Sequence, residues 1–174
     1  MSTPDLATAP LRDLVAFDFR APGRDRLADI RTVQGRVEAV LDGLPDAEWR
    51  RPLSASDVPG APPWTLMDHL GHVAVWVDES ARYVQALVDG TGGWPRDEDD
   101  AGVDYDVENE AARVRWAAMS PADVRSWHRT SVDRLLAVAE RLPADAADSD
   151  GAWDWIWHHV NAHPIEHLAP VEAG

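Results

Sequence analysis

The sequence contains no cysteine among its 174 residues. A chain without thiols forms no disulfide bond and offers no thiolate nucleophile, iron–sulfur cluster or cysteine-bound zinc. It also contains no lysine, because all sixteen of its basic residues are arginine. The chain therefore forms no Schiff base, anchors no pyridoxal phosphate and lacks the lysine of a phosphate-binding loop. These two absences exclude several large classes of enzyme.

Long apolar runs and basic clusters are lacking as well. No window approaches the roughly 18 consecutive apolar residues of a membrane span, and residues 1–10 show no basic stretch followed by an apolar one, as a secretory signal would. The net charge is −15, the arginines are scattered, and the strongest charge run, Asp97–Asp100, is acidic and reads as a solvated loop. Nucleic-acid surfaces need clustered Arg or Lys. We therefore expect a cytoplasmic protein that binds neither membranes nor nucleic acids.

The spacing of the apolar residues indicates helices. Apolar side chains recur three and four positions apart, which is typical of amphipathic helices. Thr65 followed by Asp68 predicts a capping box, and Ser120-Pro121 predicts a second helix start. The four long helices are expected over residues 24–44, 64–90, 120–142 and 153–168, with a shorter one over 106–119.

The remaining segments divide the chain into a folded unit and its ends. Five prolines predict a long non-helical connection over residues 45–63. No strand alternation persists, so we predict an all-α fold, a four-helix bundle with long connecting loops, over residues 25–170. A flexible leader is expected over residues 1–24 and a tail over 171–174.

Histidines are the candidate ligands. His163 and His167 are four residues apart, so both imidazoles project from one face of a helix and can share a metal ion. A third ligand has to come from another helix, and the second helix offers His69 and His72. Helical periodicity slightly favours His69, which lies nearer the apolar face of that helix, but it does not settle the choice. This apolar face consists of Leu66, Leu70, Val73 and Val77. The alternative is that these histidines are ordinary surface or core residues.

Two segments resemble a known family. Residues 64–76, WTLMDHLGHVAVW, are similar to the signature W-S/T-V-x-D-V-L-x-H-L-x-x-W of the DinB-like superfamily, which includes the YfiT-like and mycothiol-dependent maleylpyruvate isomerase-like proteins. Residues 161–167, NAHPIEH, resemble the closing-helix pattern N-x-x-H-x-x-E-H of its DfsB/ClbS-like branch, one residue out of register. Asn109 and the helix expected over 120–142 also lie where that branch has them. The similarity covers roughly residues 25–170.

The resemblance implies a DinB-like four-helix bundle whose metal is held by one histidine of the second helix and two of the fourth. Counting eight residues from Trp64 selects His72, so the resemblance assigns the ligand roles to His72, His163 and His167. The metal is expected to be divalent, Zn or Ni. Two positions depart from the pattern: His69 replaces a usual aliphatic residue, and Pro164 a usual aromatic or polar one. A homodimer is expected from the same resemblance.

Two carboxylates next to these histidines have open roles. Glu166 either orients a ligand imidazole or faces solvent on the helix surface, and Asp68 is either a helix-start acid or a proton acceptor near the site. Both are candidate catalytic residues. Trp155 is expected to point away from Trp153 and Trp157, as a residue at a dimer interface or a pocket rim would.

Three functions are compatible with such a site. The first is a metal-dependent enzyme, either a hydrolase or a thiol-dependent transferase or isomerase of a small electrophile. Because the chain has no cysteine, a thiol such as mycothiol would have to arrive as cosubstrate. The second is a non-catalytic bundle that binds a small molecule or protects against one. The third is a structural bundle with incidental histidines.

Overall fold

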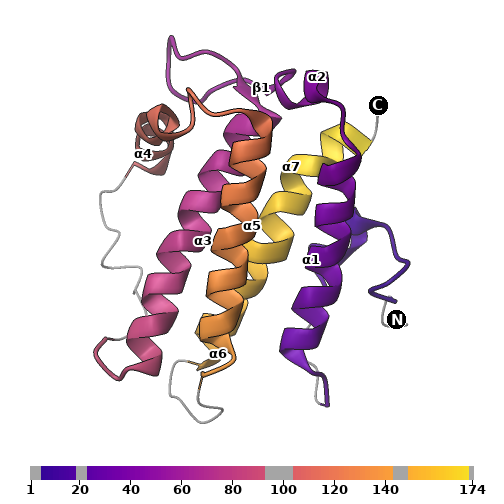
Figure 1. Ribbon diagram of the computed structural model, residues 1–174, viewed down its shortest axis with the longest axis vertical. Coiled ribbons are helices and arrows are strands. Elements are labelled where there is room, and N and C mark those ends of the chain that lie inside the picture. Colours follow the sequence, from indigo (N-terminus) through magenta and orange to yellow (C-terminus); the bar gives the residue numbers. More distant parts are fainter. Residues whose placement is uncertain (1–4, 19–22, 93–103, 143–148, 173–174) are drawn as a thin grey trace.

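The computed structural model describes residues 5–18, 23–92, 104–142 and 149–172, and these form a helical bundle (Figure 1). Its long helices are α1 (Arg26–Gly43), α3 (Leu66–Val88) and α5 (Pro121–Ala139). A last helix consists of three consecutive segments, α6 (Ser149–Trp157), the π-helical η4 (His158–Ala162) and α7 (His163–Glu172). Short elements connect them: η1 (Leu11–Leu14), α2 (Asp46–Trp49), β1 (Pro52–Ser54), β2 (Trp64–Thr65), α4 (Tyr105–Ala112) and η3 (Arg113–Arg115). The all-α fold class is confirmed.

The four long helices do not simply alternate in direction. In Figure 1 the chain runs upward in α1, downward in α3, downward again in α5, and upward in the last helix. Helix α3 packs against both α5 and the last helix, and α1 packs against the same two neighbours. The start of α3 therefore lies beside the end of α7, because these two helices are antiparallel.

Local capping explains where two of the helices begin. The Thr65 side chain accepts a hydrogen bond from the Asp68 backbone N–H, and the Asp68 carboxylate accepts one from the Thr65 backbone N–H. Ser120 and Asp123 form the same reciprocal pair ahead of α5, with Pro121 at its first position. Both predicted helix starts are confirmed.

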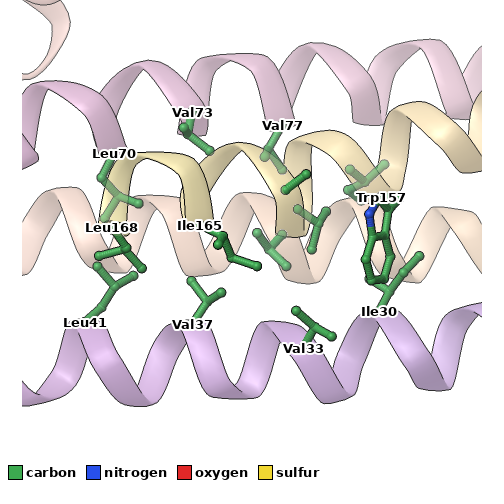
Figure 2. Packing of buried hydrophobic residues seen from close by; sticks show 14 of the residues in the cluster. Ile30, Val33, Val37, Leu41, Leu70, Val73, Val77, Trp157, Ile165 and Leu168 are labelled. Carbon is green, nitrogen blue, oxygen red and sulfur yellow. The ribbon is translucent and has the colours of Figure 1, made fainter. Parts of the chain in front are cut away.

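The core lies between the four long helices, and α5 contributes Val124, Val132, Leu135, Leu136 and Ala139 to it. Figure 2 shows Ile30, Val33, Val37 and Leu41 of α1 facing residues of α3 and of the last helix across the bundle. Their partners there are Leu70, Val73, Val77, Trp157, Ile165 and Leu168.

The expected leader is part of this core over its described residues. Four of its apolar side chains are buried: Leu6, Leu11, Leu14 and Phe17. Arg36 of α1 also donates hydrogen bonds to the backbone carbonyls of Leu6 and Ala9. Within this segment η1 packs against α7 and α1, and the ring centroids of Phe17 and Trp157 lie 5.4 Å apart. The richness of the segment in Pro, Ala and Thr did not indicate this docking.

Other boundaries differ from those predicted. The connection over 45–63 contains α2, where Trp49 is buried and Asp46 and Glu48 lie in the first turn. The shorter helix ends at Ala112 and continues only as η3. The last helix extends beyond residues 153–168 at both ends, so Val171 and Glu172 of the expected tail are helical. The acidic run over 97–100 lies outside the described residues.

None of the helices in the described ranges combines the length and apolar character that a membrane crossing requires.

Candidate metal centre

The antiparallel packing of α3 on the last helix gathers most of the histidines. His69 and His72 occupy the first two turns of α3, and His163 and His167 occupy the first two turns of α7. His158 and His159 of η4 lie beside them. His128 lies elsewhere, on α5, where its Nδ1 is 3.3 Å from Glu38 Oε1. Six of the seven histidines therefore form one cluster.

The three ligands implied by the family resemblance come together in this cluster. The Nε2 atoms of His72 and His163 are 3.1 Å apart. The ring centroids are 4.8 Å apart for His163 and His167 and 5.1 Å apart for His72 and His167. Two imidazoles that bind one Zn²⁺ tetrahedrally, with bonds of about 2.0–2.1 Å, place their nitrogens about 3.3 Å apart. The separation of His72 and His163 is therefore close to that of a ligand pair.

His69 is a neighbour of the same three rings. Its ring stacks on that of His167 with centroids 4.0 Å apart, and its Nε2 is 3.0 Å from the Ser54 hydroxyl. His69, His72 and His167 each offer a ring nitrogen within 4.8 Å of the others. The sequence presented His69 and His72 as alternatives, whereas in the fold both face the cluster. Nothing in the sequence pointed to Ser54, which reaches His69 because β1 pairs with β2.

Burial keeps these imidazoles neutral. It lowers the pKa of His69 to about 4 and that of His163 to about 3, and it lowers the pKa of His72 and His167 well below the ordinary value. Among the described residues, each of these four histidines has one buried ring nitrogen without a hydrogen-bond partner: Nδ1 of His69, His72 and His163, and Nε2 of His167. A neutral imidazole with an unpartnered nitrogen is the form that binds metal, so these residues fit a divalent cation.

The metal-free protein should lose stability below about pH 6.5. Histidines of the unfolded chain titrate near pH 6.5. In the folded chain, the buried His69 and His163 stay unprotonated until the pH approaches their lowered pKa values. Between these pH values the unfolded chain binds more protons than the folded chain, which favours unfolding. Each such histidine costs about 1.4 kcal/mol of stability per pH unit in this window. Urea unfolding of the chelator-treated protein at pH 7 and pH 5 measures this.

The carboxylates of Asp68 and Glu38 do not account for a loss in that window. Asp68 and Glu38 have lowered pKa values, so their contributions are lost only as the pH falls below their ordinary values of 3.8 and 4.5. Equal stability of the metal-free protein at pH 7 and pH 5 would contradict the burial of neutral histidines.

The Asp68 carboxylate is fully engaged in structure. Besides the Thr65 backbone N–H and hydroxyl, it accepts hydrogen bonds from Arg113 Nη2 at 3.2 Å and from Trp116 Nε1 at 3.0 Å. Burial by itself would raise the pKa of Asp68, but these hydrogen bonds and the Arg113 charge lower it. Asp68 thus ties the start of α3 to η3 and its flank, and so holds His69 and His72 in place.

The other flanking residues have distinct surroundings. Glu166 is exposed on α7. Trp76, one turn beyond His72, donates from Nε1 to Asn109 Oδ1 at 3.2 Å, which links α3 to α4. Trp155 is half-buried, donates from Nε1 to the Ser80 hydroxyl at 2.7 Å, and lines two surface cavities.

A small cavity opens onto the histidine cluster. Its volume is about 150 Å³, and His69, His72 and His167 form part of its wall. The opposite wall is mainly polar and comes from the connection before α3 and from α4. Its other lining residues are Ser54, Ala55, Ser56, Asp57, Trp64, Asp106 and Asn109. The imidazoles are therefore buried but reachable by a small molecule.

These features define a class: an all-helical bundle in which histidines of two antiparallel helices converge beside a small cavity. A model of the DinB superfamily matches residues 29–170, and the chain belongs to this superfamily. Comparison with curated proteins and with solved structures gives no match.

Proposed function

We propose that the chain is a divalent-metal-dependent enzyme whose metal is held by His72, His163 and His167. The observation that carries this proposal is the cavity of about 150 Å³ at which neutral histidines of α3 and α7 meet. Structural zinc sites are closed by four protein ligands, whereas catalytic sites keep a position open to water or substrate. Two of the three proposed ligands, His72 and His167, line this cavity, and a ligand set that opens onto a cavity fits the second kind.

The choice of metal follows from the ligands. Imidazole nitrogens suit Zn, Ni and similar transition metals, whereas Mg and Ca prefer oxygen. The proposed ligand set contains no carboxylate, so Zn or Ni is expected. A bound ion of this kind lowers the pKa of a coordinated water or thiol and polarises a carbonyl.

The chain's own residues define what can reach the site. The volume of about 150 Å³ admits a small molecule. The amide nitrogen of Asn109, whose Oδ1 accepts from Trp76, is placed to donate a hydrogen bond to a polar substrate. The Trp64 ring meets that of His72 edge-to-face, with centroids 5.3 Å apart. We therefore propose a small electrophile, such as a carbonyl compound or ester, as substrate.

The reaction is either hydrolysis or thiol addition. The resemblance to mycothiol-dependent isomerase-like proteins and to the DfsB/ClbS-like branch supports a thiol-dependent transferase or isomerase, with mycothiol as cosubstrate. The absence of cysteine from the chain is consistent with an external thiol. We also expect a homodimer on the same grounds.

Turnover assays of the Zn²⁺- and Ni²⁺-loaded protein test this function. A panel of small esters and α,β-unsaturated carbonyl compounds is incubated with and without a low-molecular-weight thiol, and products are followed by mass spectrometry. Product formation that requires the metal and falls by at least about 100-fold in His167→Ala is expected. The His128→Gln variant, altered on α5 outside the cluster, should retain activity.

A non-catalytic binding or protective protein is the second candidate. Two larger cavities with aromatic walls, of about 320 and 330 Å³, adjoin the cluster and share Trp76, Tyr105 and Trp155, which favours it. Stoichiometric binding of a panel compound without product, both with and without metal, would support this candidate against the enzyme.

A further inference from the structure

A second group of three histidines lies beside the proposed metal ligands. His158, His159 and His163 each offer a ring nitrogen within 4.8 Å of the others. Their ring centroids are 4.8 Å apart for His158 and His159, 5.2 Å for His158 and His163, and 5.9 Å for His159 and His163. Only His163 belongs also to the ligand set of the proposed function.

The π-helical segment η4 creates this group. The His163 backbone N–H donates to the carbonyl of His158, five residues earlier, so the two residues lie one above the other. In a regular α-helix, residues five apart diverge by about 140° around the axis. Here the two rings are stacked with an interplanar angle of 16°. Pro164, which has no backbone N–H to donate, follows the wide turn directly. Segments of this kind are frequent at functional sites.

Two of the three histidines present a defined free nitrogen. The His159 ring is buried, and its Nδ1 donates to the Trp155 carbonyl oxygen at 3.0 Å, which leaves Nε2 unprotonated in the neutral ring. A hydrogen bond of this kind is how proteins orient metal-binding histidines. The Nε2 of His163 faces His72, whereas its buried Nδ1 has no partner among the described residues.

The group also has its own access route. His158, His159 and His163 line a cavity of about 330 Å³, whose remaining wall consists of Trp76, Tyr105 and Trp155. This cavity is separate from the one that His69, His72 and His167 line. His158 is exposed, so an ion can reach the group from solvent without passing the first site.

We propose that His158, His159 and His163 bind a second transition-metal ion of the Zn, Ni or Cu class. His163 is shared: Nε2 serves the ligand set of the proposed function and Nδ1 serves the second ion. Binding of both ions through the two nitrogens of one ring would require His163 to release its ring proton to solvent. The second site does not depend on occupancy of the first.

Zn²⁺ stoichiometry tests the second site. The chelator-treated protein is dialysed against buffered Zn²⁺, and zinc per chain is measured by elemental analysis. Two ions per chain are expected for the wild type, and one for His158→Ala and for His159→Gln. Because His158 is exposed, its variant should fold as the wild type does, which circular dichroism checks. The His128→Gln control should keep two ions.

The outcomes separate the two sites. His167→Ala should keep one ion, bound through His158, His159 and His163. A wild type with one ion that His167→Ala loses and His158→Ala keeps would overturn the second site and leave the proposed function standing. One ion lost in His158→Ala but kept in His167→Ala would support the second site and contradict the first. Two ions that persist in both His158→Ala and His159→Gln would overturn the second site.

Discussion

Zn²⁺ affinity at the proposed triad should fall by at least about 100-fold when His167 is replaced by alanine. The substitution removes an Nε2 atom that is buried and unpartnered among the described residues, and it leaves only two ligands on different helices. Removing a residue that only hydrogen-bonds to a metal ligand already lowers metal affinity by about 10–100-fold. Competition with a chromophoric chelator measures the dissociation constant. The comparison is made in a His158→Ala background, which removes the second histidine group.

The control for this prediction is His69. The family resemblance assigns the ligand role on α3 to His72, and the His69 Nε2 already meets the Ser54 hydroxyl at 3.0 Å. We therefore expect His72→Ala to lose the metal and His69→Ala to keep it. Loss of metal in His69→Ala together with retention in His163→Ala would instead identify the group of His69, His72 and His167 as the ligand set.

Gly71→Ala should destabilise the protein by about 3 kcal/mol. A Cβ atom at Gly71 would lie 2.6–2.8 Å from three atoms of the Trp116 indole. The Trp116 side chain has little room to shift, because it is fully buried and its Nε1 donates a hydrogen bond to Asp68 Oδ1. Overpacking of a rigid core costs about 1–3 kcal/mol, occasionally more. Since Gly71 lies between His69 and His72, metal affinity should fall as well.

Gly35→Ala is the matched control for Gly71→Ala. Gly35 also lies inside a helix, α1, but a Cβ atom there would meet nothing within 4 Å. Because alanine is the better helix former, this change should stabilise the protein by about 0.5–1 kcal/mol. Urea unfolding of both variants gives the comparison. Similar stabilities for the two would show that the Trp116 contact does not constrain α3.

The histidine cluster shows where prediction from sequence ends. The pairing of His163 with His167 follows from helical periodicity, which needs only local spacing. Whether His69 or His72 faces that pair depends on how α3 rotates and slides against α7, and periodicity left the choice open. In the fold both contact the His167 ring. The family resemblance favoured His72, whose Nε2 lies 3.1 Å from that of His163, and its role as a ligand stays a prediction.

The second histidine group was beyond sequence analysis for a different reason. His158 and His163 are five residues apart, a spacing that points in different directions on an α-helix. They meet only because η4 is π-helical. A π-helical turn is rare, so local sequence spacing does not predict it. Pro164, which the sequence analysis noted only as a departure from the family pattern, directly follows this turn and has no backbone N–H to donate.

By itself, the sequence determined the all-α fold class, the starts of α3 and α5, and the i, i+4 histidine pair, because apolar periodicity and capping act within one or two helical turns. The tertiary structure decided the rest. It docked Leu11 and Leu14 onto the core, gave Asp68 its partners Arg113 and Trp116, and placed both histidine groups beside cavities. These outcomes depend on contacts between residues 45 or more positions apart, or on how whole helices pack against one another. Local sequence patterns predict neither.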